Sequence, residues 1–277
     1  MITRHHIALT IMSTLILCSA LVPVSPVLIL LICTGAGIGA ILPDIQMKKP
    51  GCFQVRTFAW MITRFSRHVC MPLLCQMYRN LTGQDLDCGD KRLTHSLPGI
   101  VFLWTVPAVL LLVPASILMD SAALYIPAAF LGGLMLGLIL HLAEDLCTRK
   151  GITPIFPFST VKIFGSIRPC DSTDRRIAQF HYYDCSVAAI ILAFQYLGTG
   201  PAIPAESICI FGLGSCLGMM ILSSDVQIIS EDPKDGVPIP PPQILLDPIF
   251  FLGKPRYPTT GLMMGVYYLK ADEGIPD

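Results

Sequence analysis

Five ionisable side chains of the kinds that bind metals occur in the first 145 residues, each next to an apolar run. They are three histidines and two aspartates: His6, Asp44, His95, His141 and Asp145. His141 and Asp145 are four residues apart, so on a helix they project from the same side and can bind one ion. Imidazole and carboxylate together suit zinc or a similar divalent metal. These residue types predict a metal site if the chain between them brings all five together.

The chain around these residues has the composition of a membrane protein. Of its 277 residues, 53% are hydrophobic and 14% are charged, whereas a soluble domain carries about 25% charged residues. Long uncharged runs with this composition exclude disorder and argue against a water-soluble enzyme. The 19 basic residues balance the 19 acidic ones, so net charge gives no indication of a nucleic-acid partner, and none is expected. Most of the 11 cysteines are predicted to be small buried hydrophobes or reduced thiols.

The apolar runs predict an all-α fold, a polytopic membrane bundle of about six helices with cytoplasmic loops and an irregular C-terminal tail. The first uncharged run is too long for one crossing and is broken at Pro23 and Pro26, which indicates a helical hairpin. Two further pairs follow, the last of them short for spans. The expected helices are 7–22, 27–42, 97–119, 122–140, 185–197 and 208–223.

Basic residues indicate how this bundle is oriented. The connectors within the three helix pairs contain no Lys or Arg, so all 19 basic residues lie elsewhere. An even number of spans with this distribution puts both termini in the cytoplasm by the positive-inside rule. We therefore expect a multi-pass protein of the cell membrane, with all five candidate residues at its cytoplasmic face.

Taken singly, a histidine or aspartate at the membrane edge can simply cap a helix or lie among headgroups, and His5, His68 and His181 are interpreted in that way. The set of five on one face favours a site, because ionisable groups near the bilayer are costly without a role.

Glycine spacing supports the convergence of two helices. Gly35 and Gly39 precede Asp44, and an equally spaced pair, Gly133 and Gly137, precedes His141. Small residues at this spacing let membrane helices approach closely, so Asp44 and His141 would emerge near each other if these helices touch. The motif is common in membrane helices, however, and Gly214-x-x-x-Gly218 shows it with no candidate site nearby.

Three parts are expected along the chain. Residues 53–77 within the first part have arginines at helical spacing among apolar residues, which fits either an amphipathic helix on the cytoplasmic surface or a packing helix of the same loop. The parts are a membrane-bound domain over 1–165 with four helices and the cytoplasmic loop 45–94, an additional helical pair over 166–223, and a Pro-rich cytoplasmic tail over 224–277.

Five short motifs occur in an order that resembles one family. They are Arg4-His5-His6, GAILPDI at 39–45, RLTHS at 92–96, HLAED at 141–145 and GITPIFPFS at 151–159. Together they look like the YdjM-type family of inner-membrane, metal-dependent hydrolases, some of which are LexA-regulated. That family is distantly similar to zinc phospholipase C and P1-type nucleases, which cleave phosphodiesters with clustered zinc ions.

The resemblance covers roughly residues 1–165 and implies an inner-membrane location and a divalent metal, zinc. It assigns the metal ligands as His6, Asp44, His95, His141 and Asp145. The chain departs from the family where Asp90-Lys91-Arg92 stands in place of the usual His-Arg-Gly, and where Gln46 replaces an acid or histidine. Asp90 could replace the histidine as an oxygen ligand, or it could be a surface acid. The resemblance therefore does not imply a second or third metal.

These features predict a membrane-bound metal-dependent hydrolase acting on a phosphoester or lipid-like substrate at the cytoplasmic face. Its catalytic residues would be Asp44, His95, His141 and Asp145. Asp44 or Glu144 could accept a proton, although Glu144 is expected to face away from the ligands.

Lys91 and Arg92 could hold phosphate, or they could belong only to the positive-inside signal. The alternative function is a non-enzymatic, metal-stabilised membrane scaffold or a small transporter. A transporter would need polar residues near the middle of the bilayer, and helices 27–42, 97–119 and 122–140 have almost none.

Overall fold

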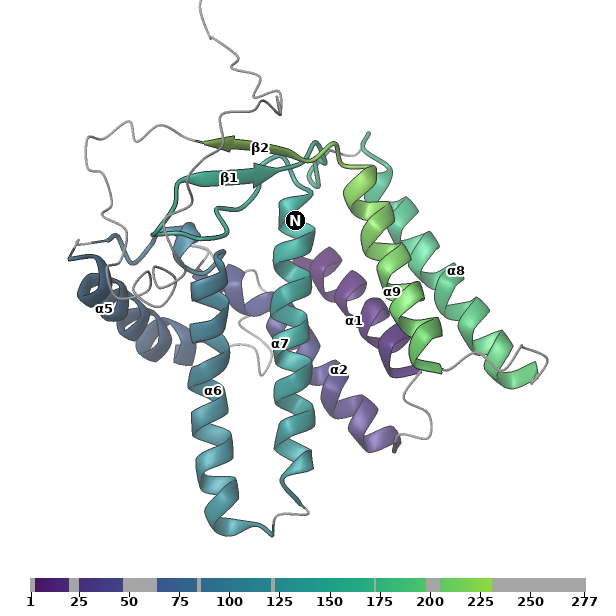
Figure 1. Ribbon diagram of the computed structural model, residues 1–277, viewed down its shortest axis with the longest axis horizontal. Helices are drawn as coiled ribbons and strands as arrows, with labels where there is room; N and C mark the ends of the chain where they lie inside the picture. Colours follow the sequence, from purple (N-terminus) through teal and green to yellow (C-terminus); the bar gives the residue numbers. More distant parts are fainter. Residues whose placement is uncertain are drawn as a thin grey trace, which may run out of the picture. The chain divides into compact units, whose positions relative to one another are not determined.

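The computed structural model of the protein is mostly helical. It describes residues 3–19, 25–46, 64–83, 86–120, 123–171, 173–197 and 205–230. These residues contain seven α-helices, three short helices of other types and one two-stranded sheet (Figure 1).

A helix lies at each of the six predicted positions. The six are α1 (Thr3–Ser19), α2 (Pro26–Ile41), α6 (Leu97–Leu118), α7 (Tyr125–Leu146), α8 (Arg176–Leu197) and α9 (Ala205–Leu222). Among the described residues, three segments are long and apolar enough to cross a membrane: Pro26–Asp44, Leu97–Leu118 and Tyr125–Leu146. The apolar parts of α1 and α9 are shorter, and α8 begins with the polar residues that precede its apolar half. The structure thus supports three candidate spans within a helical fold.

Helices α2 and α7 make the most extensive helix contact in the described part of the chain. A Cβ atom added at Gly35 would meet the Phe130 carbonyl oxygen, and one added at Gly137 would meet the Ala36 carbonyl oxygen. Backbones this close leave no room for any side chain larger than hydrogen. The predicted contact through the two glycine pairs is therefore confirmed, and α7 lies between α6 and the α1–α9 side of the bundle (Figure 1).

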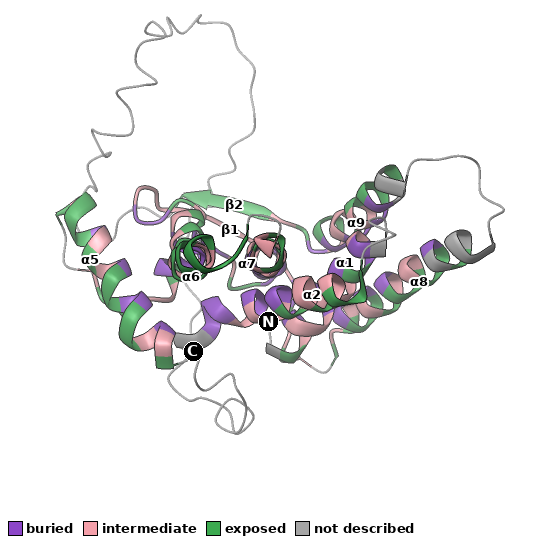
Figure 2. Cartoon of the chain, turned by 90° about the horizontal axis from the view of Figure 1, so that it is seen from below, coloured by how far each residue is buried: buried purple, intermediate pink, exposed green. Residues whose placement is uncertain are grey.

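The far half of α6 exposes its apolar side chains. Val109, Val113, Ile117 and Leu118 are all exposed, and the end of α6 nearest the viewer in Figure 2 is coloured accordingly. An exposed apolar surface of this kind is unfavourable in water and marks a surface that lipid or another protein covers. This part of the structure suits a membrane environment.

A small antiparallel sheet was not expected in the predicted all-α fold, so that prediction needs correction. Strand β1 (Val161–Phe164) pairs with β2 (Gln227–Ser230), with Val161 opposite Ser230. Strands of four residues show too little alternation to be distinguished from loop in the sequence, and β2 lies where an irregular tail is predicted. The remainder of that tail, 231–277, lies outside the described residues.

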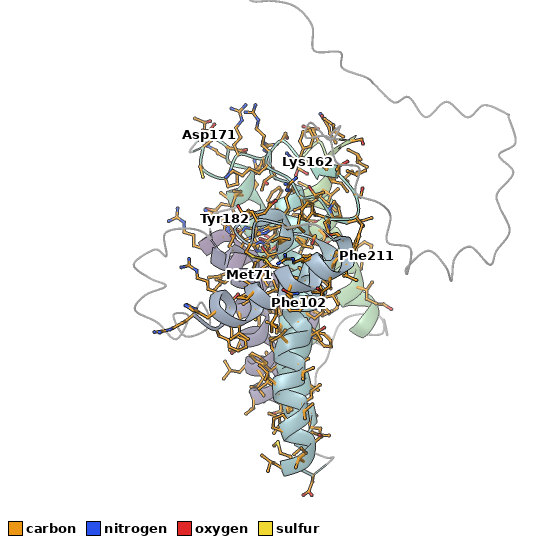
Figure 3. All side chains as sticks on the ribbon, turned by 90° about the vertical axis from the view of Figure 1, so that its left-hand side faces the viewer. Met71, Phe102, Lys162, Asp171, Tyr182 and Phe211 are labelled. Carbon is orange, nitrogen blue, oxygen red and sulfur yellow. A yellow bond between two sulfur atoms is a disulfide. The ribbon has the colours of Figure 1, made fainter. Side chains whose placement is uncertain are left out.

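The loop before α6 is partly helical. From residue 64 the chain forms a π-helix, η2 (Ser66–Cys70), and then α5 (Met71–Thr82), whereas 53–63 fall outside the described residues. Met71, Leu74 and Tyr78 are buried in a cluster against which Phe102 of α6 packs (Figure 3). The described half of this segment therefore packs against the rest of the protein, as expected for a packing helix of this loop.

Cysteine pairing also differs from expectation at one place. Cys75 and Cys88 form a disulfide, while the other cysteines of the described residues are free. No spacing signal in the sequence indicates this pair.

Candidate metal centre

Four of the five predicted ligands form one compact group at the ends of three helices. Asp44, His95, His141 and Asp145 each present one ligand atom, and these atoms all lie within 4.8 Å of one another. All four side chains are buried. Asp44 lies in the 3-10 helix η1 (Leu42–Gln46), His95 precedes α6, and the other two lie one turn apart near the end of α7. We call these four residues the His/Asp group.

Local capping interactions hold His95 at this position. Ser96 caps α6 by accepting a hydrogen bond from the Gly99 amide, which fixes where the helix begins. The Thr94 hydroxyl donates to the Pro43 carbonyl oxygen at 3.0 Å. The motif around His95 is thereby tied directly to the residue that precedes Asp44.

Distances within the His/Asp group suit a cation of the size of zinc. His95 Nε2 lies 3.1 Å from His141 Nε2, 3.2 Å from Asp44 Oδ1 and 3.4 Å from Asp145 Oδ2. Ligand atoms about 2.0–2.1 Å from a tetrahedral zinc are about 3.3 Å from one another. Two imidazoles and two carboxylates are also a ligand set that zinc accepts.

His95 and His141 both turn Nε2 toward the centre because Nδ1 is bonded elsewhere. His141 Nδ1 lies 2.7 Å from the Ala40 carbonyl oxygen, and His95 Nδ1 lies 3.0 Å from that of Lys91. A carbonyl oxygen only accepts, so each Nδ1 carries a hydrogen, and in the neutral ring each Nε2 presents a lone pair. Two such lone pairs at 3.1 Å repel each other unless a proton or a metal cation lies between them. Metal-binding histidines typically donate from the other ring nitrogen in this way.

His6 lies beside the His/Asp group. Its Nε2 is 3.3 Å from Asp145 Oδ1, and its ring stacks on His141 with the centroids 4.2 Å apart. Asp145 therefore faces His6 with one carboxylate oxygen and His95 with the other. The predicted role of His6 as a fifth ligand stays a prediction.

Glu144 does not face away from this region, and that expectation was wrong. It is buried, accepts a hydrogen bond from His6 Nδ1 at 2.6 Å, and accepts another from the Thr10 hydroxyl at 3.2 Å. The expectation considered only the ligand side of α7, whereas α1 packs on another side of the same helix. His6 and Thr10, one turn apart on α1, are the sequence signal that could have indicated a buried polar partner.

Three buried polar atoms in this region lack a hydrogen bond in the described chain: His6 Nε2 and both carboxylate oxygens of Asp44. His6 Nε2 and Asp44 Oδ1 still have ion-pair partners, whereas Asp44 Oδ2 has none among the described residues. Burying an atom such as Asp44 Oδ2 without a partner costs about 1–3 kcal/mol.

Lys91 Nζ forms ion pairs with Asp44 Oδ1 at 3.1 Å and with Asp145 Oδ2 at 3.2 Å. His6, which faces Glu144 with one ring nitrogen and Asp145 with the other, can carry a second positive charge. These two charges still leave one of the three carboxylates Asp44, Glu144 and Asp145 unbalanced, so the residues present fit an additional cation.

Lys91 keeps its charge in this setting. Burial lowers the pKa of its ammonium group, but the attraction of Asp145 and Asp44 outweighs that effect and the pKa is raised overall. The lysine therefore partly neutralises the carboxylates.

A cavity of about 160 Å³ lies next to His95, which lines it. We call it the basic cavity. Its lining includes Lys91, Arg92, Lys150, Thr153 and Lys162.

Arg92 does not point freely into this cavity. It forms an ion pair with Asp90 at 2.8 Å, and its guanidinium group lies over the Phe156 ring. Asp90 also caps the short helix η3 (Lys91–Leu93), so its contacts are those of a surface acid. Lys150 and Lys162 were not singled out from the sequence, because nothing in the spacing brings them to His95.

The three histidines interpreted as structural make local contacts. His5 Nδ1 on α1 and His181 Nε2 on α8 lie 3.3 Å apart. His68 Nδ1 donates a hydrogen bond to the Arg64 carbonyl oxygen. Their side chains do not belong to the His/Asp group.

One comparison with known proteins identifies the family. The family model described as YdjM inner membrane protein matches residues 1–215, which extends the expected resemblance into α8 and α9. No curated protein and no solved structure gives a match. Because the matched segment covers most of the chain, the protein belongs to this family.

Proposed function

We propose that this member of the YdjM inner membrane protein family is a metal-dependent hydrolase that cleaves a phosphoester at the cytoplasmic membrane surface. The observation that carries the proposal is the buried His/Asp group, whose four ligand atoms lie within 4.8 Å of one another. Buried ionisable residues are costly in a membrane protein, so a cluster of them at the ends of candidate spans favours a functional role.

The His/Asp group would hold the cation, with zinc as the preferred ion. A divalent cation in that place supplies a Lewis acid for a phosphoryl oxygen and a nucleophilic water at neutral pH. The chain itself directs the Nε2 lone pairs of His95 and His141 inward and keeps the carboxylates of Asp44 and Asp145 beside them.

Asp44 is better placed than Glu144 to take the proton released by the attacking water. Asp44 Oδ2 is buried without a hydrogen bond, so it can accept a proton while Oδ1 remains directed at His95 and Lys91. Glu144 already accepts hydrogen bonds from His6 and Thr10. Its role would be to orient His6.

The proposed cytoplasmic orientation rests on the distribution of the 19 basic residues. The disulfide between Cys75 and Cys88 argues the other way, because disulfides persist mainly in oxidising compartments. The proposed orientation follows the charge distribution, because that distribution involves many residues whereas the disulfide involves one pair.

The test combines metal content with turnover. The full chain would be purified in detergent, stripped with a chelator, reloaded with zinc, and assayed on bis-p-nitrophenyl phosphate and on phospholipids in mixed micelles. Asp44→Asn preserves shape and removes a ligand, whereas His68→Ala removes an exposed histidine outside the His/Asp group. Asp44→Asn should lose zinc affinity by more than the roughly 10–100-fold typical of a residue behind the ligands, and should lose turnover.

His68→Ala should retain both properties. Zinc that stays bound to the wild-type chain without hydrolysis of any ester would favour the metal-stabilised scaffold. Equal zinc binding by the Asp44→Asn and His68→Ala chains would refute the metal site itself.

A further inference from the structure

We infer that Lys91 competes with the metal ion for the carboxylates of Asp44 and Asp145, and that it thereby sets the zinc concentration at which the His/Asp group is filled. This inference rests on the proposed function, because it concerns the regulation of the same metal site. The competitor is the ammonium group of the chain itself.

The first observation is that Lys91 and His95 approach the same two oxygen atoms. Lys91 Nζ lies 3.1 Å from Asp44 Oδ1 and 3.2 Å from Asp145 Oδ2. His95 Nε2 lies 3.2 Å and 3.4 Å from these same two atoms. A metal ion bound by His95 and the two carboxylates would therefore share both oxygens with the lysine.

The burial of these carboxylates makes such sharing unfavourable. The side chains of Asp44 and Asp145 are only 1% and 4% exposed, so water and salt screen the charges around them poorly. A divalent ion and an ammonium group that meet the same oxygens therefore repel each other. Because the divalent ion carries twice the charge of the ammonium group, the lysine is the one that gives way.

The Lys91 side chain has space into which it can withdraw. It is 40% exposed, and it lines the basic cavity of about 160 Å³ together with His95. The flexible four-carbon stem of a lysine lets the ammonium group turn away from the carboxylates toward this cavity. The lysine can therefore leave the carboxylates by a movement of its side chain alone.

The backbone of Lys91 is held in place while its side chain moves. His95 Nδ1 lies 3.0 Å from the Lys91 carbonyl oxygen, and the Thr94 hydroxyl donates to the same oxygen at 3.2 Å. Asp90 caps the helix η3 that begins at Lys91. Withdrawal of the ammonium group leaves these bonds intact, so His95 keeps Nε2 directed at the His/Asp group.

Two opposite effects on zinc binding distinguish a competitor from a structural contact. A competitor lowers zinc affinity, because its ion pairs must break before the metal ion can bind. A contact that only maintains the shape of the site raises zinc affinity, because it keeps the ligands together. Removal of Lys91 should therefore tighten zinc binding in the first case and weaken it in the second.

The experiment measures zinc affinity of the full chain in detergent, after removal of metal, by competition with a fluorescent chelator. Lys91→Met removes the charge and keeps the length of the side chain, whereas Lys91→Arg keeps the charge. The matched control is Lys150→Met, since Lys150 also lines the basic cavity and is exposed. This control leaves both ion pairs of Lys91 in place.

Lys91→Met should bind zinc about 10–100-fold more tightly than the wild type, because two charge-assisted contacts no longer oppose binding. Lys91→Arg should bind no more tightly than the wild type, and Lys150→Met should change by less than about threefold, as expected for an exposed, screened charge. Unchanged or weaker zinc binding by Lys91→Met, or an equal gain in Lys150→Met, would overturn the inference.

Thermal unfolding of the same samples adds a second readout. Without zinc, Lys91→Met should unfold at a lower temperature than the wild type, because Asp44 and Asp145 lose their counter-ion. Saturating zinc should close or reverse this gap, since tighter binding gives a larger stabilisation. An equal loss of stability with and without zinc would show a structural contact and contradict the competition. Lys91→Gln replaces Lys91→Met in both measurements if elution volume shows that the methionine variant is not folded.

Hydrolysis of bis-p-nitrophenyl phosphate by the same samples separates this inference from the proposed function. Tighter zinc binding by Lys91→Met with no hydrolysis by any chain would support the competition and refute the hydrolase. Hydrolysis by the zinc-loaded wild type, with no gain of zinc affinity in Lys91→Met, would support the hydrolase and overturn the competition. No zinc uptake by any chain would refute both.

Discussion

Three glycine motifs have the same spacing, but only those on α2 and α7 bring two helices into close contact. On α2 and α7 the glycines face the backbone of the partner helix, so that the Cβ of any other residue would collide with it. On α9, Gly214 and Gly218 have no atom within 4 Å of the place where a Cβ would lie. Spacing alone permits close approach, but a partner helix with a matching surface must be present for the approach to occur.

The difference matters for the site because the tight crossing also sets its geometry. Gly39 is followed by Ala40, whose carbonyl oxygen accepts the hydrogen bond from His141 Nδ1 at 2.7 Å. A shift of α2 away from α7 would move both this acceptor and Asp44. The α8–α9 side instead packs through ordinary side chains such as Ile16, Ile191 and Cys216.

Breaking the tight crossing should have the largest effect. In Gly137→Ala, the new methyl group meets the Ala36 carbonyl oxygen, so the two helices must separate. Overpacking of this kind costs about 1–3 kcal/mol, and bound zinc should fall in parallel because Asp44 and His141 move apart. Thermal unfolding in detergent and zinc content measure the two effects.

Gly214→Ala is the matched control, since it adds the same methyl group where space is open. It should leave zinc content unchanged and could raise stability slightly, because alanine favours helix more than glycine does. If Gly214→Ala cost as much stability and zinc as Gly137→Ala, the contrast between the two motifs would be wrong.

A smaller effect is expected from the residue behind His6. Glu144→Gln keeps the shape of the side chain but removes the charge that orients the His6 ring. Carboxylates that bond metal-binding histidines typically contribute about 10–100-fold in metal affinity. Competition with a zinc chelator should show a loss of that order if His6 takes part in binding.

Asp184→Asn is the matched control for Glu144→Gln, because Asp184 is also a buried acid but lies on α8. Its zinc affinity should stay within about threefold of the wild type, a difference below 1 kcal/mol. Equal losses in the two variants would mean that Glu144 acts only through the general charge of the bundle.

Helix positions and the face that carries the site could be predicted because membrane helices have a narrow range of lengths. Once two hairpins are assigned, the end of one helix and the start of the next must lie on the same side, and this brings Asp44, His95 and His141 to one face. The glycine pairs then indicated which helices touch. The proximity of the His/Asp group follows from these two constraints together.

Other features depend on packing that the sequence does not encode locally. Glu144 is directed at His6 because α1 lies against α7, and no periodicity within either helix indicates that contact. Lys150 and Lys162 line the same cavity because the two short segments that carry them pair at Ile152 and Ile163. The predicted six spans exceeded the three that the described helices support, because α1, α8 and α9 combine apolar stretches with polar ends.

The smallest expected effect concerns a polar contact at the start of α8. Arg176 bonds Asp174 at 2.7 Å and also donates to the carbonyl oxygens of Ser166 and Ser223, which ties α8 to the end of α9. Hydrogen bonding from Arg176 holds the pKa of Asp174 well below its usual range. The stability that this carboxylate contributes is therefore present above its unfolded pKa of about 4 and is lost as the pH falls below that value.

Because the contact is partly exposed to solvent, its contribution should be less than about 1 kcal/mol. Asp174→Asn should lower stability at pH 6, and its difference from the wild type should shrink steadily as the pH falls below about 4. Asp120→Asn, just after the end of α6, should follow the wild type throughout. Thermal unfolding in the metal-free form is the decisive measurement, because zinc release cannot then contribute to the pH dependence. A wild-type and an Asp174→Asn chain that lose stability in parallel with acidification would show that this contact does not stabilise the α8–α9 side, and that its side-chain packing alone does.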